Sequence, residues 1–555
     1  TAGRSPSMCS LIITEAIAEA KTLKIPLITA TEDARKAFDV VSHEILKLKL
    51  FHTNIHPRIW NLIDSLYQNG SERIRYMGAY SSTYAVLQGV KQGGGLSPDL
   101  YKWYIFELLE SLKEDKIGLH IGNIYLGTPT CADDVFFMSN DPTGNEMQAM
   151  LNVSVNYSSV HRWEIHPTKS TTTILHDTKD IERRAWTLGN KVMPTVNEFP
   201  HLGLTWRASK SQPDIDEIIS TTRRCSYKLL GIGVHGGNGL NPCHSSKILN
   251  TYVWSVMLSG TEALVLRRAD MDKLEDFYRS TLRRIQNLPQ STANCAVYLL
   301  IGVIPVEGLI HLRMLTLFGN ITRLGERHPL RELALRQLAL ARPHSWFCHL
   351  HKIAELYKIN ITHALISPWK KEHWKEHCRT AVRCHWHRTL LSESYQRTTL
   401  RSLIFDHKQI KPHGCWSACG VYPHLVPAAV TRMRLMTGRA GLKQASWRKD
   451  TTCPLCKQED ESLEHFLVLC PKLEDHRQDI SRLRVLYVED NNRPPWNTEE
   501  LASALMNGDC YRSCEPSLEV ISLTDARKDI AQNLCSSICL KLYKERDYLL
   551  SSSIM

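Results

Sequence analysis

Three acidic residues are spaced so that they could bind divalent metal ions. Asp33 follows a short apolar run, Pro26–Thr31, that predicts a strand, and the pair Asp133 and Asp134 lies far downstream between apolar segments. Adjacent aspartates near a core are costly unless a cation neutralises them. A strand-end aspartate and a distant Asp-Asp pair supply the oxygen ligands that two hard cations need, and such ions can hold a triphosphate and activate a hydroxyl. Taken alone, the pair also fits a solvated turn.

A glycine-rich loop, Gln88–Pro98, adds a second element. The segment Tyr84–Val90 predicts a strand that leads into it, and Gly93–Gly95 let the backbone approach a ligand closely. Ser97 as N-cap and Pro98 as first helical residue predict a helix directly after the loop. A simple phosphate cradle is the alternative, although the sequence has neither a Walker Lys-Ser/Thr pair nor a Rossmann pattern.

The segments that would position these residues alternate between strand and helix patterns over residues 1–205. Apolar spacing predicts helices over Glu44–Leu50, Ile59–Tyr67 and Leu100–Leu112. The Asp-Asp pair is placed at the turn of a hairpin between Tyr125 and Met138. This mixture predicts an α/β or α+β fold.

The order of these motifs resembles that of a known family. Asp33–Asp39, Gln92–Pro98 and Ala132–Asp134 resemble motifs A, B and C of a reverse transcriptase, an RNA-directed DNA polymerase. Further segments favour the non-LTR (LINE-type) retrotransposon branch. They are Gly3–Ser5 before motif A, Trp163–Lys169 as motif D and Phe199–Gly203 as the primer grip.

The resemblance implies an α+β fold, a right-hand polymerase palm with an antiparallel sheet and helices, followed by a helical thumb. It implies two Mg²⁺ ions, deoxynucleotides, an RNA template and a DNA primer, with the nicked target strand as primer. It also assigns roles: Asp33, Asp133 and Asp134 as catalytic metal ligands, Phe38 against the sugar, Gln92 and Gly93 at the nucleotide and template, and Lys169 as a donor at the pyrophosphate.

The sequence departs from the family pattern at several positions. Cys131 replaces the usual aromatic residue, Glu32 stands where an apolar residue is expected, and His166 stands where asparagine is frequent. Because neither fingers nor an endonuclease precedes Gly3, we expect an N-terminally truncated copy. The competing interpretation is a catalytically inactive or domesticated copy that acts as a nucleic-acid-binding protein.

A cysteine- and histidine-rich cluster near the C-terminus predicts a metal site. Cys453, Cys456, His465 and Cys470 follow the spacing C-x2-C-x8-H-x4-C, which suits one tetrahedral structural Zn²⁺. The cluster also resembles the CCHC zinc knuckle of many non-LTR elements. The histidines and cysteines within residues 373–387 match no standard zinc spacing, so helical packing is the favoured interpretation there.

Two basic segments suit a nucleic-acid partner. Arg267–Arg284 could neutralise phosphates along a helix, and Lys370–Arg388 interleaves cations with tryptophans that could stack bases. A solvated amphipathic helix is the alternative for the first segment. The predicted domains are a palm with incomplete fingers (1–205), a thumb (206–330), a basic helical connector (331–440), the zinc knuckle (441–485) and a helical tail (486–555).

Composition sets broader limits. The 555 residues are 43% hydrophobic and 23% charged, which excludes a disordered chain, a collagen and a small disulfide scaffold. The formal net charge of +11 suits a polyanionic partner. The 17 cysteines at irregular spacings indicate a reducing compartment, and no membrane span is expected. We expect a protein that acts in a ribonucleoprotein of nucleus and cytoplasm, without DNA cleavage by this chain and with the oligomeric state open.

Overall fold

The computed structural model describes most of the chain in two compact units. The described residues are 5–53, 55–132, 134–162, 164–166, 169–178, 185–210, 212–236, 239–400, 403–406, 408–438, 440–443, 450–487, 497–508 and 525–552. Unit 1 comprises Thr1–Glu217, Ser259–Leu266 and Arg313–Lys375. Unit 2 comprises Ile218–Leu258, Arg267–Leu312 and Glu376–Met555. Both units take up distant parts of the chain, so these boundaries differ from those of the five predicted domains, which stay a prediction.

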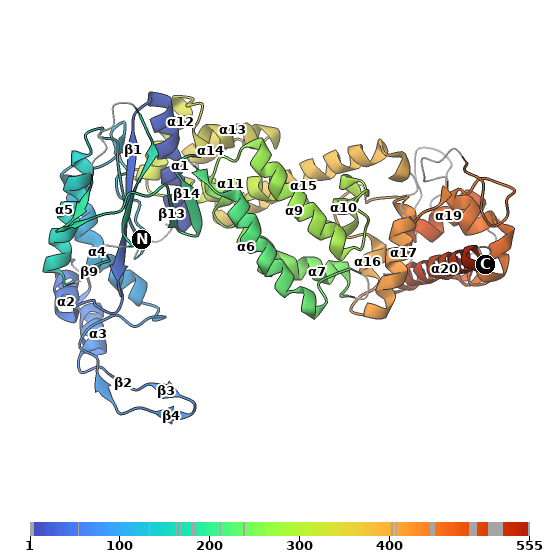
Figure 1. The fold of residues 1–555 in the computed structure, drawn as a ribbon, viewed down its shortest axis with the longest axis horizontal. Helices are drawn as coiled ribbons and strands as arrows, with labels where there is room; N and C mark the ends of the chain where they lie inside the picture. Colours follow the sequence, from blue (N-terminus) through green and yellow to red (C-terminus); the bar gives the residue numbers. More distant parts are fainter. Residues whose placement is uncertain are drawn as a thin grey trace. The chain divides into compact units, whose positions relative to one another are not determined.

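The described structure is a mixed α+β fold that is mostly helical (Figure 1). The strands are β1 (Leu27–Arg35), β2 (Ser71–Glu72), β3 (Arg75–Tyr76), β4 (Ala79–Tyr80), β5 (Tyr84–Ala85), β6 (His120–Ile121), β7 (Ile124–Tyr125), β8 (Asp134–Ser139), β9 (Glu164–Ile165), β10 (Thr171–His176), β11 (Thr187–Leu188), β12 (Lys191–Val192), β13 (Glu198–His201), β14 (Leu204–Arg207) and β15 (Gln212–Pro213). The helices up to residue 301 are α1 (Pro6–Leu23), α2 (His43–His52), α3 (Pro57–Tyr67), α4 (Ser97–Glu114), α5 (Asn145–Val160), α6 (Ile215–Lys228), α7 (Pro242–Leu249), α8 (Ser255–Met257), α9 (Arg268–Ile285) and α10 (Asn294–Ile301). Those that follow are α11 (Val306–Thr322), α12 (Pro329–Ala339), α13 (Trp346–Leu356), α14 (Ile361–Ile366), α15 (Lys371–Tyr395), α16 (Gly414–Ser417), α17 (Val426–Met436), α18 (Ile480–Tyr487), α19 (Thr498–Asn507) and α20 (Asp525–Ser552).

A small antiparallel sheet lies at the centre of unit 1. Its order is β10-β1-β8, and β9 pairs with the end of β1. Alternate residues of β1, among them Ile28 and Ala30, join the buried cluster formed with α4 and α5. On the other face, Phe136 of β8 packs against Phe199 and His201 of β13. Because successive side chains of a strand point to opposite faces, this packing fixes the register of β1.

Helix α1 is tied to a part of unit 1 that lies far away in the sequence. The Glu15 carboxylate is fully buried and accepts hydrogen bonds from the Gln337 side chain, the Ser345 hydroxyl and the Trp346 N–H, at 2.8, 2.9 and 2.6 Å. Burial raises the pKa of Glu15 to about 7, although these hydrogen bonds oppose the rise. The segment 313–375 therefore completes the structure that begins with α1.

Several predicted elements are confirmed, and others are corrected. Helices α2, α3 and α4 occupy the segments with helical apolar spacing. The strand predicted over Tyr84–Val90 is limited to β5, since the chain turns away towards the loop after Ala85. The hairpin predicted between Tyr125 and Met138 is wrong, because β7 pairs with β6 whereas β8 pairs with β1. Ser97 is not an N-cap: α4 starts at Ser97 itself, whose hydroxyl donates to the Lys91 carbonyl at 2.6 Å.

Unit 2 is helical, and its arginines are partly engaged in internal contacts. In α9, Arg283 is buried and donates to the Thr292 carbonyl, and Arg268 pairs with Asp272 at 3.0 Å. These contacts leave fewer donors for phosphates than the sequence pattern predicted. In the described part of the chain, no single helix has the length and apolar character to cross a bilayer. The bent pair α10 and α11 meets that test only jointly, with a 60° break.

Candidate active site and metal cluster

The sheet brings the two ends of the acidic constellation together. Asp33 of β1 and Asp134 of β8 are direct partners in the antiparallel ladder, which places their Cα atoms about 5 Å apart. Both side chains are exposed or half-exposed. Like charges directly opposite each other destabilise a sheet. Since carboxylate oxygens are the ligands of hard divalent cations, this pair is suited to bind such an ion.

The turn that leads into β8 is tight. Cys131 and Asp134 exchange two backbone hydrogen bonds of 3.1 Å, and Ala132 has a left-handed φ of +56°. Asp133, which the resemblance makes a principal metal ligand together with Asp33, lies outside the described residues, as do Gly3 and Arg4.

The predicted motif D segment passes beside Asp33. The His166 N–H donates to the Asp33 carbonyl at 2.8 Å, and the Asp33 N–H donates to the Ser170 hydroxyl at 3.1 Å. The Lys169 ammonium lies 3.5 Å from the Asp33 carboxylate. The pairing of Lys169 with Asp33 was not predicted, and Ser170 was missed because nothing in a single serine after a lysine marks it. Trp163 lies outside the described residues.

The glycine-rich loop docks on the turn that follows Asp33. The Gly89 N–H donates to the Val41 carbonyl and the Val90 N–H to the Phe38 carbonyl, both at 2.8 Å. Gly89 has a φ of +93°, and a Cβ there would lie 2.9 Å from the Asp39 carbonyl oxygen. Only glycine fits this close approach without a shift of backbone. The structure thus brings motifs A and B together through the backbone.

The side chains at this junction are held in place. The Phe38 ring stacks on Tyr101 of α4, with centroids 4.9 Å apart, and is only partly buried. Gln92 donates from its amide to the Asp39 carboxylate at 3.1 Å. Gly93 adopts a φ of +80° in the same loop. Phe38, Gln92 and Gly93 therefore lie around the turn that follows Asp33.

Glu32 explains one departure from the family pattern. Its neighbour Asp33 lies on the exposed face of β1, so the Glu32 side chain points into the core, where it is 2% exposed. One carboxylate oxygen accepts from the Ser154 hydroxyl of α5 at 2.5 Å. Burial raises the pKa of Glu32 to about 8, because water no longer stabilises the carboxylate.

We expect Glu32→Gln to remove part of the pH dependence of stability. Between about pH 4.5 and 8 the folded chain retains a proton on Glu32 that the unfolded chain releases, so the free energy of unfolding falls as pH rises. Glutamine keeps the acceptor for Ser154 without this penalty, which should make the variant more stable by a few kcal/mol above pH 8. Urea unfolding of both proteins at pH 5, 7 and 9 measures the difference. An equal difference at all three values would contradict a titrating Glu32.

The same part of the chain matches a known family. Residues 4–220 match the family described as "Reverse transcriptase (RNA-dependent DNA polymerase)". They form a reverse transcriptase domain. Curated relatives of this domain include the Pol polyprotein of the R2DM retrotransposable element of Drosophila melanogaster, 25% identical over 188 residues, and that of an R2 element of Popillia japonica, 22% identical over 277 residues. The matches cover 32% and 47% of this chain, but only 18% and 43% of those two relatives. The domain is therefore related to those of R2-type non-LTR retrotransposons.

A comparison with solved structures finds the telomerase of Candida albicans in complex with a fragment of telomeric RNA. The sequence identity is 11% and the TM-score 0.30, over 62% of this chain and 54% of that one.

Beyond the reverse transcriptase domain, unit 2 contains the predicted cysteine and histidine cluster. One ligand atom from each of its four residues lies within 4.8 Å of all the others: Cys453, Cys456, His465 and Cys470. Within the described ranges no other group of three or more cysteine, histidine or acidic side chains converges in this way. The described histidines and cysteines of α15 do not form a cluster of this kind.

Groups around the cluster orient its ligands. The His465 Nδ1 lies 2.9 Å from the Glu459 carboxylate, so the Nε2 atom faces Cys456 Sγ at 3.4 Å. A carboxylate on the second ring nitrogen is typical of metal-binding histidines. Burial disfavours the Cys456 thiolate, but the N–H groups of Gln458 and Glu459 lower its pKa to about 7. Glu459 was not predicted, although a glutamate between the ligands is a possible signal.

Two arginines, Arg477 and the buried Arg546, fix the cluster within unit 2. The Arg477 guanidinium donates to the carbonyls of Leu467 and Cys470, both at 2.8 Å. Arg546 of α20 forms a buried, bidentate pair with Glu461 at 2.6 and 3.0 Å. Such a pair is expensive to break, since one charge would stay buried alone. The cluster is therefore anchored to the last described helix.

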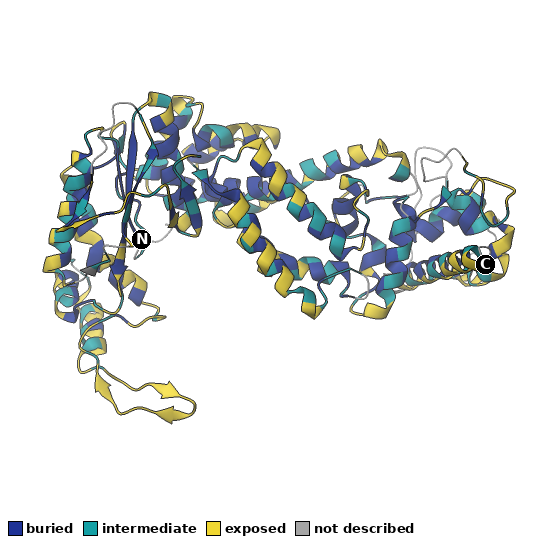
Figure 2. Cartoon of the chain, in the orientation of Figure 1, coloured by how far each residue is buried: buried dark blue, intermediate teal, exposed yellow. Residues whose placement is uncertain are grey.

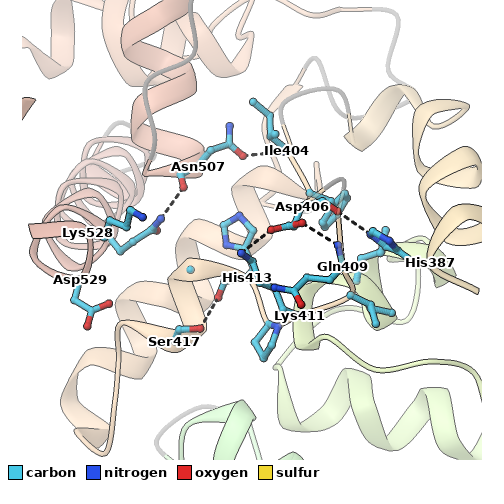
Figure 3. Close-up of a pocket in the computed structure, with 16 residues that line it drawn as sticks. His387, Ile404, Asp406, Gln409, Lys411, His413, Ser417, Asn507, Lys528 and Asp529 are labelled. Carbon is cyan, nitrogen blue, oxygen red and sulfur yellow. Dashed lines mark hydrogen bonds and ion pairs between the residues drawn. The ribbon is translucent and has the colours of Figure 1, made fainter. Parts of the chain in front are cut away.

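A pocket of about 370 Å³ also lies in unit 2 (Figure 3). His387 contacts the Asp406 carbonyl at 2.7 Å, and the Asp406 carboxylate accepts from the Gln409 N–H at 3.0 Å and pairs with Lys411 at 2.6 Å. These polar groups satisfy one another, as the dashed lines in Figure 3 show. The pocket therefore lies where α15, the segment 403–414 and α20 pack together.

One predicted base-stacking residue has another role. Trp374 of α15 is buried, and its indole N–H donates to the Leu315 carbonyl at 2.7 Å. Its ring also lies against Gly319, where a Cβ would be 2.1 Å from the indole. The prediction that this indole stacks bases is therefore wrong, because a buried tryptophan packs in the core.

Proposed function

We propose that the chain is an RNA-directed DNA polymerase of an R2-type non-LTR retrotransposon. It would extend the 3′-hydroxyl of a DNA primer with deoxynucleotides along an RNA template. The observation that carries this proposal is the register that sets Asp33 opposite Asp134, beside a glycine-rich loop docked on the same turn. Nucleotidyl transfer needs this combination of a metal-binding acidic pair and a backbone surface open to a nucleotide.

The acidic residues fit two Mg²⁺ ions, with Asp33, Asp134 and Asp133 as the ligands. When bound, the ions would lower the pKa of the primer hydroxyl and stabilise the departing pyrophosphate. The chain's own residues would do the rest. Phe38 would exclude a 2′-hydroxyl, and Gln92 and Gly93 would line the nucleotide. Lys169 would separate from Asp33 and donate a hydrogen bond to the pyrophosphate.

The architecture would follow the right-hand pattern. Residues 1–205 would be the palm with incomplete fingers, and residues 206–330 the thumb that tracks the duplex. A basic connector (331–440), the Cys/His module (441–485) and a tail (486–555) would follow. The cluster would hold one structural Zn²⁺ and help bind nucleic acid, since its ligand set is that of a closed tetrahedral site. Such a protein would act in a ribonucleoprotein of nucleus and cytoplasm.

Primer extension on an RNA template tests the proposal. The expected result is Mg²⁺-dependent incorporation of deoxynucleotides. Template binding without any extension, at all Mg²⁺ and Mn²⁺ concentrations, would instead support the inactive, nucleic-acid-binding copy.

We expect Phe38→Ala to relax the choice of sugar. Loss of the ring that stacks on Tyr101 should open space for a 2′-hydroxyl. The preference for deoxynucleotides over ribonucleotides should fall by about 10- to 100-fold, the range that steric discrimination of one small group provides. Competition between dGTP and GTP in primer extension measures the ratio. Phe106→Ala, at an exposed position of α4, is the control and should leave the ratio unchanged.

A further inference from the structure

An arm of two short antiparallel strand pairs projects from unit 1 between α3 and the glycine-rich loop (Figure 2). It consists of residues 71–85, in which β2 pairs with β5 and β3 pairs with β4. Every residue of the arm is exposed. An isolated pair of strands has no core of its own and is marginally stable in water. Large exposed side chains on such an element indicate a surface that binds a partner.

The side chains of the arm combine cations with aromatic rings. The Arg73 and Arg75 guanidinium carbons lie 5.6 and 5.8 Å from the centroid of the Tyr80 ring. Tyr76 and Tyr80 are 71% and 61% exposed. Two like charges held over one exposed ring create a local positive potential. Guanidinium groups and aromatic faces together bind phosphates and stacked bases of single strands.

The arm is joined directly to the candidate active site. At its base the Val86 N–H donates to the Gly70 carbonyl at 2.8 Å, and Gln88 forms a bridge with Ser42. The next residue is Gly89, whose N–H bonds to the turn that follows Asp33. The base of the arm therefore adjoins the turn that follows Asp33.

We propose that the arm binds single-stranded RNA, namely the part of the template that has not yet been copied. The inference rests on the proposed function, because the template is the RNA strand that this site would use. Serine and threonine residues interleave the tyrosines of the arm, at Ser81, Ser82 and Thr83. Ile74 and Met77 of the arm are also exposed, at 60% and 89%, so a protein partner is the alternative that the test below separates from RNA. Glu72 is the one acid among residues 71–85.

The test measures binding to template–primer duplexes with a short or a long template overhang, of about 2 or about 12 nucleotides. The variant combines Arg73→Ala, Arg75→Ala and Tyr80→Ala. It should bind the long overhang at least tenfold more weakly and the short overhang normally. The dependence of log Kd on log salt should decrease by about 1.4, the value for two phosphate contacts to a single strand. Tyr80→Phe, which keeps the ring, should bind like the unmodified protein.

A matched control removes two exposed cations elsewhere in unit 1, by Lys113→Ala with Lys191→Ala. It should leave the preference for the long overhang unchanged. Equal affinity of the arm variant and the unmodified protein for the long overhang would overturn the proposal. So would loss of self-association without loss of RNA binding, which would identify a protein-binding surface.

The two proposals can fail separately. Asp33→Asn, with an intact arm, should keep full affinity for the long overhang although it extends no primer. If the unmodified protein never extends a primer but shows arm-dependent binding of the overhang, the arm proposal stands and the polymerase proposal fails. If extension occurs and the arm variant is indifferent to overhang length, the arm proposal alone fails.

Discussion

Replacing Asp33 with asparagine should lower primer extension by about a thousandfold, equivalent to about 4 kcal/mol in the transition state. The amide keeps the size of the side chain but removes one charge from the pair that faces Asp134. Folding should be almost unaffected. The substitution stabilises the fold by relieving the repulsion between two facing carboxylates, and it destabilises the fold by removing the pairing with Lys169. Each effect is worth less than about 1 kcal/mol, so they largely cancel.

The measurement compares single-nucleotide incorporation with template binding and thermal unfolding. Asp115→Asn, an exposed acid beyond the end of α4, is the control and should extend primers normally. Extension by Asp33→Asn within tenfold of the unmodified protein would show that Asp33 is not a ligand of the catalytic metals. A strongly lowered unfolding temperature would show instead that Asp33 has a structural role.

Replacing Cys453 with serine should remove one zinc ion per chain and destabilise unit 2. Cys453 is buried, and its sulfur lies 4.0 Å from that of Cys470, so the lost ligand cannot be replaced by a neighbour without rearrangement. Metal binding to such a site is coupled to folding. The unfolding temperature of unit 2 should fall by about 10 °C, which corresponds to about 3–5 kcal/mol.

Metal analysis by mass spectrometry and calorimetry measure both effects. Cys384→Ser, at an exposed cysteine of α15, is the matched control and should retain the zinc. Glu459→Gln should keep the metal but bind it about 10- to 100-fold more weakly, because the carboxylate orients His465. A structural metal site would be contradicted if the unmodified protein contained no zinc and stayed folded and equally stable in the presence of a chelator.

Local patterns in the sequence predicted the chemistry of both sites. The spacing of Cys453, Cys456, His465 and Cys470 is short, so the chain itself holds these ligands within reach of one another. The order of Asp33, the glycine-rich loop and Asp134 predicted one site, because each lies at the end of a strand or at the start of a helix. The structure places Asp33 opposite Asp134 and gathers the four cysteine and histidine ligand atoms, while the roles of these residues stay a prediction.

Contacts between distant segments could not be predicted in this way. The inward direction of Glu32 depends on the register of β1 against β8, which one sequence does not reveal. The burial of Trp374 depends on close approach of Gly319 from another helix. Ser97 was predicted as a cap from its own properties, but the Lys91 carbonyl is its partner in the folded loop.

The hydrogen bonds that Glu15 accepts limit which gene segments could be exchanged between related proteins. The family match ends at residue 220, but the donors to Glu15 come from Gln337, Ser345 and Trp346. A gene fragment that encodes the matched region alone would leave this acid without these donors and would expose the side of α1 that packs against α13. Recombination between related genes would therefore have to transfer the segment 313–375 together with the matched region to keep the hydrogen bonds of Glu15.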